Sequence, residues 1–173
     1  MFRVQKVEIQ RFRDVSLYDC VGIIGVYIVW DENSDIIPTY IGKGNLFSRL
    51  GSHHLRFKPP LDGYIAIFGE VGDQRADHHA EMLEGMLLFV ADETKRLSKN
   101  NRQRARLAKI KKQLKKHNIV RAQITGYDPF SPPRFRRPLS DDKKYIRAFV
   151  GDNGSLEIEH KFQCLRGARN SHP

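Results

Sequence analysis

Cysteine is scarce in this sequence of 173 residues, which has only two, Cys20 and Cys164. They lie far apart in the chain and form no C-x-x-C pair. This spacing supplies neither a disulfide framework nor the ligands of a zinc site. We therefore expect a cytoplasmic protein, or one associated with the nucleoid, in a reducing environment.

A long apolar run is also missing. No stretch approaches the roughly 20 residues that a membrane-spanning helix needs, and the N-terminal stretch MFRVQKVEIQRFR has no apolar core of the kind found in signal peptides. Charged residues make up 29% of the chain and hydrophobic residues 40%, which is typical of a soluble globular protein. We expect such a protein, with no membrane partner.

Acidic residues are outnumbered. The chain has 20 Asp and Glu against 30 Lys and Arg, which gives a net charge of +10 and a pI near 9.8. Such an excess favours a polyanionic partner, and nucleic acid is the most common one. The alternative is a protein that is merely basic, for example one that associates with ribosomes.

Three runs of β-branched and aromatic side chains predict strands, at residues 26–30, 36–41 and 64–68. Apolar residues at helical spacing predict helices over residues 46–55 and 80–91, and acidic residues near position 73 favour the start of the second helix. This order predicts an α/β fold of the α+β kind, a small three-stranded and mostly antiparallel sheet with helices on one face. A weaker alternation over residues 2–10 predicts an edge strand.

The stretch from Lys95 to Lys116 contains no acidic residue. Leu107, Ile110 and Leu114 form a thin apolar stripe at helical spacing, so the stretch predicts a helix docked along one narrow edge. Solvated helix faces normally mix both signs of charge, so a face of one sign favours an arm that binds a phosphate backbone. We expect nucleic-acid contacts from Arg102, Arg104, Arg106, Lys109, Lys112 and Lys116.

The C-terminal part predicts a proline-rich surface loop over residues 128–138 and a β-hairpin formed by residues 144–149 and 155–162. The predicted organisation has four parts: residues 1–24 as an N-terminal lead-in strand, 25–101 as the core, 102–121 as the basic helix, and 122–173 as the proline-rich loop and hairpin.

Groups that can contact phosphate are concentrated in residues 25–54. Gly25-Val26-Tyr27 and Tyr40-Ile41-Gly42 lie on the first two predicted strands; Arg49 follows nine positions after Tyr40, and His53 follows four positions later. Together with Glu84 on the predicted helix 80–91, these residues resemble the GIY-YIG nucleases, with Val26 in place of the motif's isoleucine. The resemblance covers residues 25–101, less than half of the chain.

The resemblance implies a role for each matched residue. Glu84 would hold a single divalent cation, Mg²⁺ or Mn²⁺, with Glu81 as the rival ligand and an ion pair with Arg75 or Lys43 as the structural alternative. The planar fork of Arg49 would hold a phosphate. Tyr27 would act as general base or position the attacking water.

Supporting roles fall on neighbouring residues. Tyr27 needs a nearby cation to favour its phenolate, because the ordinary tyrosine pKa is near 10. Lys43 is the first expected supplier of that charge, and the metal ion is the second. Tyr40 would line the site, Gly42 would allow close approach of the substrate, and His53 would donate to the phosphate or move a proton. Asn100 or Asn101 matches the family's later asparagine.

We expect from these residues a metal-dependent endonuclease that acts on nucleic acid, DNA in preference to RNA. The alternative is a module on the same scaffold that binds nucleic acid without cutting it. One active site cuts one strand, so cutting both strands of a duplex requires a homodimer or two successive nicks.

Overall fold

The computed structural model describes residues 1–31, 37–56, 62–139 and 145–162. Of residues 52–56 and of Asn101 only the backbone is described. Cys164 lies outside the described residues, as do Ile36 of the predicted strand 36–41 and residue 144 of the predicted hairpin. Cys20 is buried, in the core that lies beneath the first helix.

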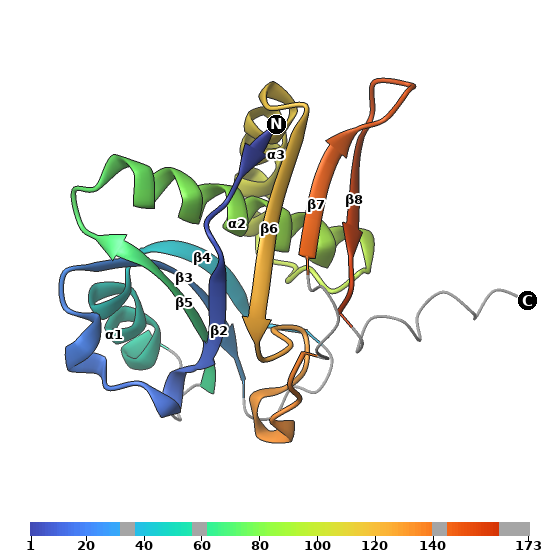
Figure 1. Ribbon diagram of the computed structural model, residues 1–173. Helices are drawn as coiled ribbons and strands as arrows, with labels where there is room; N and C mark the ends of the chain where they lie inside the picture. Colours follow the sequence, from blue (N-terminus) through green and yellow to red (C-terminus); the bar gives the residue numbers. More distant parts are fainter. Residues whose placement is uncertain (32–36, 57–61, 140–144, 163–173) are drawn as a thin grey trace, which may run out of the picture.

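Within the described residues, eight strands form one mostly antiparallel sheet (Figure 1). The strand order is β4-β3-β5-β2-β6-β7-β8, with β1 beside β6, and only the pairs β1–β6 and β2–β6 are parallel. The strands are β1 (Phe2–Arg3), β2 (Val7–Arg11), β3 (Ile23–Trp30), β4 (Tyr40–Asn45), β5 (Asp62–Glu70), β6 (Ile119–Gly126), β7 (Tyr145–Val150) and β8 (Leu156–His160).

The α+β class is confirmed, but the predicted three-stranded sheet is too small, because the described sheet has eight strands. The predicted strands are β4, β3 and β5, and the sheet continues from β5 through β2 to β6, β7 and β8. β2 is therefore an interior strand and not an edge. β6 was not predicted from the sequence. Its side chains nevertheless alternate as in a strand with one buried face: Val120, Ala122 and Ile124 are buried, and Arg121 and Gln123 are exposed.

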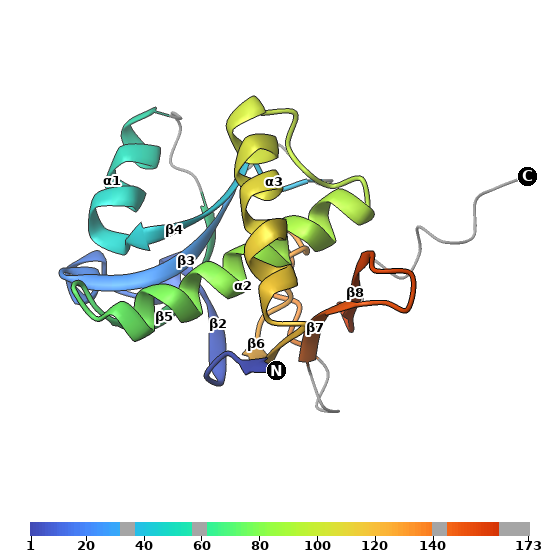
Figure 2. The same ribbon diagram turned by 90° about the horizontal axis from the view of Figure 1, so that it is seen from above.

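Three α-helices pack on this sheet in the described part of the chain: α1 (Leu46–Arg56), α2 (Gln74–Glu93) and α3 (Asn101–Lys116). Figure 2 shows α1 and α2 on opposite sides of β3. The side chains of β3 alternate accordingly, with Val26 and Ile28 in the core under α2, and Tyr27 and Val29 in the core under α1. Helices therefore cover both faces of the sheet, which corrects the expectation of one covered face.

Helix α3 docks on α2 along the predicted stripe, with Leu107, Ile110 and Leu114 buried. Gly85 of α2 makes the close approach possible, since a Cβ atom there would stand 2.0 Å from Cγ2 of Ile110. The start of α2 also agrees with the sequence reading, because the side chain of Asp73 caps it by accepting from the backbone N–H of Arg75 at 2.8 Å.

The C-terminal hairpin is present as β7 and β8, joined across residues 151–155. The proline-rich segment before it is less exposed than expected, because Phe130 and Ser131 are buried. The indole Nε1–H of Trp30 donates to the carbonyl of Pro129 at 3.2 Å, and the hydroxyl of Tyr64 donates to the carbonyl of Ser131. The segment is thus fixed to β3 and β5.

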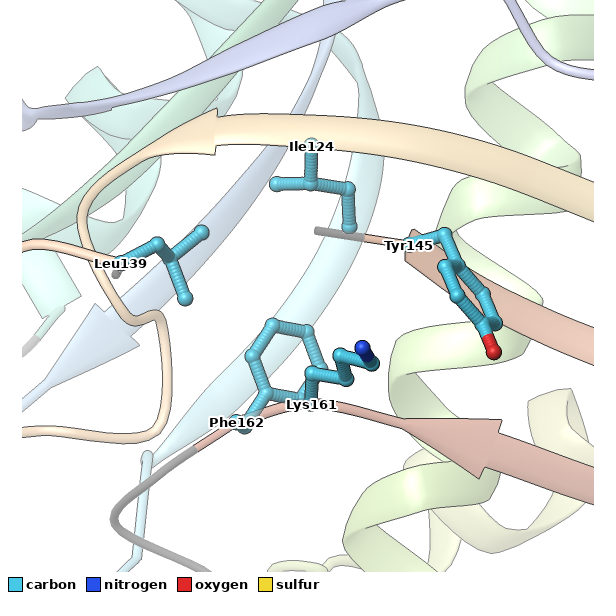
Figure 3. Close-up of a pocket in the computed structure, with 5 residues that line it drawn as sticks. All are labelled: Ile124, Leu139, Tyr145, Lys161 and Phe162. Atoms are coloured by element: carbon cyan, nitrogen blue, oxygen red, sulfur yellow. The ribbon is translucent and has the colours of Figure 1, made fainter. Parts of the chain in front are cut away.

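A small gap remains where the hairpin meets β6. Figure 3 shows Ile124, Leu139 and Phe162 around it, with Tyr145 and Lys161 at its rim. The cavity measures about 10 Å³ and is apolar, so it is no larger than a single water and lacks partners for one. It is a packing defect and not a binding site.

Two histidines, one in α2 and one at the end of α3, contact the N-terminal segment. The backbone N–H of Gln5 donates to Nδ1 of His79 at 2.8 Å, and the ring of Phe2 lies 5.1 Å from His79 and 4.9 Å from His117, between ring centroids. Burial lowers the pKa of His79, with Arg75 and His78 acting in the same direction and Asp73 opposing them. Burial also lowers the pKa of His117, as do His78, the N-terminal amine and Lys116.

These lowered pKa values predict a loss of stability in mild acid. Above the ordinary histidine pKa of 6.5 the folded and unfolded chains both carry neutral rings, so the stabilising contribution is complete. As the pH falls below 6.5, the unfolded chain takes up protons before the folded chain does, and the free energy of unfolding falls. Urea unfolding across this range measures the loss. A His79→Gln/His117→Gln variant is expected to show a weaker pH dependence, and an equally strong one would contradict the assignment.

Candidate active site

The two tyrosines of the motif lie side by side on the β3–β4 hairpin. Tyr27 pairs with Gly42 and Val29 pairs with Tyr40, so the two tyrosine side chains project on either side of Gly42. Their ring centroids are 6.0 Å apart and their planes differ by 10°. A Cβ atom at Gly42 would stand 2.6 Å from the hydroxyl of Tyr27 and 2.7 Å from Cε1 of Tyr40. A glycine is therefore needed at position 42 for this arrangement.

Arg49 folds back onto the end of this hairpin from the first turns of α1, which begins at Leu46. Its Nε would lie 3.1 Å from a Cβ atom at Gly44, whose φ of +142° is also one that favours glycine. Arg49 itself is exposed to solvent. It thus combines a fixed position near the tyrosines with access for a ligand.

Glu84 is buried in α2, with 3% of the residue exposed, and it has a cationic partner. The guanidinium of Arg106 donates from Nη2 to Oε2 of Glu84 at 2.6 Å, and from Nε to Oε2 at 3.1 Å and to Oε1 at 3.3 Å. A further bond of 3.3 Å joins Nη2 of Arg106 to Oε1 of Glu81. The partner comes from α3, and not from Arg75 or Lys43.

Burial is the largest single cause of the pKa shift of Glu84 and also acts on the pKa of Arg106. It raises the pKa of Glu84, while the hydrogen bonds and charge of Arg106, and the charge of Lys43, act to lower it. Burial lowers the pKa of Arg106, but Glu84 and Glu81 outweigh that effect and raise it, so the guanidinium keeps its proton. We treat Glu84 and Arg106 as an ion pair on these grounds, because a carboxylate in this setting requires a nearby cation.

Lys43 has a different partner from the one expected. Its Nζ lies 2.6 Å from Oδ1 of Asp77, in the first turn of α2. The pair joins β4 to the start of α2. Lys43 also lies near enough to Glu84 for its charge to lower the pKa of that carboxyl.

Charged groups from α1 and from α2 both act on the pKa of Tyr27. Burial raises the pKa of Tyr27 well above the ordinary value, Tyr40 and Glu84 raise it further, and Arg49 lowers it. The cation that acts on the phenol is therefore Arg49 and not Lys43. A phenol with a raised pKa stays protonated at neutral pH, which favours hydrogen-bond donation over the role of general base.

Three further residues were matched by the resemblance, and the structure describes the side chain of only one of them, Asn100. The side chains of His53 and Asn101 lie outside the described part of the structure. Asn100 caps α3, since its side chain accepts from the backbone N–H of Arg102 at 2.9 Å. This contact gives Asn100 a structural role at the start of the basic helix.

Gln103 contacts the candidate site but was not predicted from the sequence to do so. It is 1% exposed, its Oε1 accepts from the backbone N–H of Ile41 at 2.8 Å, and its Nε2 donates to the carbonyl of Ile41 at 2.8 Å. These two bonds pair the backbone N–H and carbonyl of Ile41, which β4, as an edge strand, would otherwise leave without a strand partner between Tyr40 and Gly42. The available clue was its spacing, because Gln103 stands one turn before Leu107 on the buried stripe of α3.

The cationic residues of α3 divide into two groups. Arg106 lies in the site beside Glu84. The other expected contacts are exposed, namely Arg102, Arg104, Lys109, Lys112 and Lys116. Arg102, Lys109 and Lys116 follow one another at intervals of seven residues, so they share one face of the helix. This face projects away from the stripe that packs on α2.

Glu84 was expected to hold a divalent cation, with Glu81 as the rival ligand, and both carboxylates contact Arg106. Among the described residues, no three or more His, Cys, Asp and Glu side chains are grouped to hold a metal by themselves. Mg²⁺ usually keeps several waters and takes only one or two protein carboxylates, so the oxygen atoms of Glu84 fit its chemistry. The ion would compete with Arg106 for the same oxygen atoms.

No protein-family model matches the chain, and comparisons with curated proteins and with solved structures find no match either. No helix among the described residues is long and apolar enough to cross a membrane.

Proposed function

We propose that the protein is a metal-dependent endonuclease that hydrolyses phosphodiester bonds in nucleic acid, with DNA as the preferred substrate. The observation that carries the proposal is the packing of Tyr27 and Tyr40 around Gly42, with Arg49 beside the hairpin and Glu84 within electrostatic reach of Tyr27. The exposed cationic face of α3 lies on the helix that contacts both Ile41 and Glu84.

Each residue has a task in hydrolysis that suits its environment. The attacking water forms a bond to phosphorus and loses a proton to the solvent, the bond to the leaving oxygen breaks, and the leaving oxygen takes up a proton from the solvent. Arg49, exposed and always charged, would bind the phosphate and oppose the negative charge that develops on it. Tyr27, which keeps its proton, would donate a hydrogen bond to the phosphate or orient the water.

Glu84 would hold the divalent cation, which supplies a positive charge to the phosphate oxygens when it is bound. Lys43 and Asp77 would fix the orientation of β4 relative to α2, so that the hairpin and Glu84 keep their spacing. Arg106 keeps the buried carboxylate compensated when no metal ion is bound.

The experiment that tests the proposal is a comparison of end-labelled duplex, single-stranded and branched oligonucleotides incubated with the purified protein. Cleavage is expected with Mg²⁺ or Mn²⁺ and not with a chelator, at internal positions of at least one substrate. Mapping the products also defines the preferred substrate. Intact substrates in every metal-containing reaction would count against the nuclease.

A second candidate is a module that binds nucleic acid without cutting it. The observation that favours it is Arg106, whose guanidinium occupies both oxygen atoms of Glu84. This candidate predicts tight binding to the same oligonucleotides and no cleavage with either metal.

Both candidates predict a salt-dependent interaction through α3. Changing Lys109 and Lys112 together to glutamine is expected to weaken DNA binding and to reduce the slope of log K against log salt by about 2, since each removed phosphate contact lowers the slope by about 1. Fluorescence anisotropy over a salt series measures the slope. Lys111→Gln is the matched control, because its Nζ already lies 3.3 Å from Oδ2 of Asp92. Equal slopes for the wild type and the double variant would place the binding surface elsewhere.

A further inference from the structure

A cleft of about 280 Å³ lies apart from the candidate active site. It is formed where β2 and β3 end and β5 begins, at the lower end of the sheet in Figure 1, and the loop that contains the short 3-10 helix η3 (Pro133–Phe135) closes one side. Among the described residues, none that line it belongs to the site built on Tyr27 and Glu84.

Arginine dominates the polar part of this cleft. Arg11, Arg13 and Arg134 line it, against the two carboxylates of Asp31 and Asp62. Nη2 of Arg11 lies 3.3 Å from Oδ2 of Asp62, and Nε of Arg13 lies 3.6 Å from the same oxygen. One carboxylate oxygen thus contacts two guanidinium groups.

Arg11 retains a hydrogen-bond donor that its carboxylate neighbours do not satisfy. The residue is 5% exposed, and its Nε–H is the one buried side-chain polar group without a hydrogen-bond partner in the described part of the chain. A buried donor without an acceptor is unfavourable and rare in native proteins. Asp14 does not correct it, because its oxygen lies 3.9 Å from Nη1 of Arg11 and its side chain is half-exposed.

The rest of the cleft is apolar and rigid. Pro132 and Pro133 form one wall, and Trp30, which is 1% exposed, contributes to the lining from β3. The volume lies near the lower end for small-molecule sites, so it suits a ligand of the size of a single nucleotide and excludes a duplex. An anionic group beside an apolar body is the chemistry that this lining complements.

We propose that this cleft binds one nucleotide, with the phosphate facing the arginines and the base against the two prolines. The choice of a nucleotide over another phosphorylated molecule rests on the proposed function. Two sources share this chemistry, a free nucleoside monophosphate and the phosphorylated terminal nucleotide of a strand.

The sole tryptophan of the chain, Trp30, lines the cleft and provides a local fluorescence reporter. The wild-type protein is titrated in chelator, so that no cleavage occurs, with a nucleoside monophosphate, the matching nucleoside and inorganic phosphate. Calorimetry repeats each titration. A saturable response to the monophosphate is expected, with binding of the nucleoside or of inorganic phosphate about tenfold weaker or more. Oligonucleotides with and without a 5′-phosphate then distinguish the two sources.

The variants are chosen so that the fold is preserved. Arg13 is half-exposed and Arg134 is exposed, and the Arg13→Gln/Arg134→Gln protein is expected to bind the monophosphate about tenfold more weakly. Arg137→Gln, in the same exposed loop but outside the lining, is the matched control and is expected to bind normally.

Three results would overturn the proposal: no saturable response by fluorescence or calorimetry, equal binding of inorganic phosphate and the monophosphate, or equal weakening in Arg137→Gln. The outcome is separable from the nuclease assignment. If the monophosphate binds but no nucleic acid is cleaved, the nuclease assignment is wrong and the nucleotide site stands. If nucleic acid is cleaved but the monophosphate does not bind, the nuclease assignment stands and the nucleotide site is wrong.

Discussion

Changing Glu84 to glutamine is expected to reduce cleavage by about a thousandfold or more, because the loss of a charge that acts on the phosphate through a cation costs several kcal/mol of transition-state stabilisation. Glutamine keeps the shape of the side chain but loses the charge that attracts the cation. Nucleic-acid binding should be retained or slightly strengthened, since the change removes a negative charge. Steady-state cleavage and anisotropy, measured on the same preparation, separate the two effects.

Glu81 is the matched control for this change. It lies one turn earlier on α2, and its Oε1 contacts the same guanidinium of Arg106 at 3.3 Å. The Glu81→Gln protein should therefore retain most of the activity. If Glu81→Gln were inactive and Glu84→Gln active, the metal ligand would be Glu81, and if both were fully active, the site would lie elsewhere.

Arg106→Gln is expected to destabilise the protein by about 3 kcal/mol, the usual cost of leaving one member of a buried ion pair uncompensated. The 3% exposure of Glu84 gives its carboxylate little access to water as a substitute. Mn²⁺ or Mg²⁺ should restore part of the loss by taking the place of the guanidinium at Glu84. Chemical denaturation with and without metal measures both quantities.

The double variant Arg106→Gln/Glu84→Gln provides the control for this interpretation. Removal of both charges should return much of the stability and abolish the effect of the metal, since neither a stranded carboxylate nor its ligand atoms remain. A metal effect of equal size in the single and double variants would place the ion away from Glu84. An Arg106→Gln protein as stable as the wild type in chelator would show that the ion pair contributes little.

The elements that position the β3–β4 hairpin could be predicted from local patterns in the sequence. The β-branched run of β3, the apolar spacing of α2 and the stripe on α3 each depend on neighbours within a few turns or residues. β6 was missed because its alternation follows directly on the basic helix and carries small or polar residues at Ala122 and Gln123. Its burial depends on β2, which is more than a hundred residues away in the chain.

The partners in the candidate site depend on tertiary packing. Lys43 was expected to act on Tyr27, but its Nζ forms an ion pair with Asp77 at the start of α2. Arg106 was expected to face a phosphate backbone, but the approach of α3 at Gly85 brings it to Glu84 instead. No local spacing encodes the angle at which α3 crosses α2, so the ion pair was not predictable from the sequence.

The central claim is that the Tyr27 hairpin and Glu84 form one metal-dependent site for phosphodiester hydrolysis. Its most direct test is the conversion of supercoiled plasmid to nicked product by the wild-type and Glu84→Gln proteins in Mg²⁺. The account predicts nicking by the wild type that stops when the metal is chelated, and none by the variant. Equal nicking by both proteins, or none by either, would contradict it.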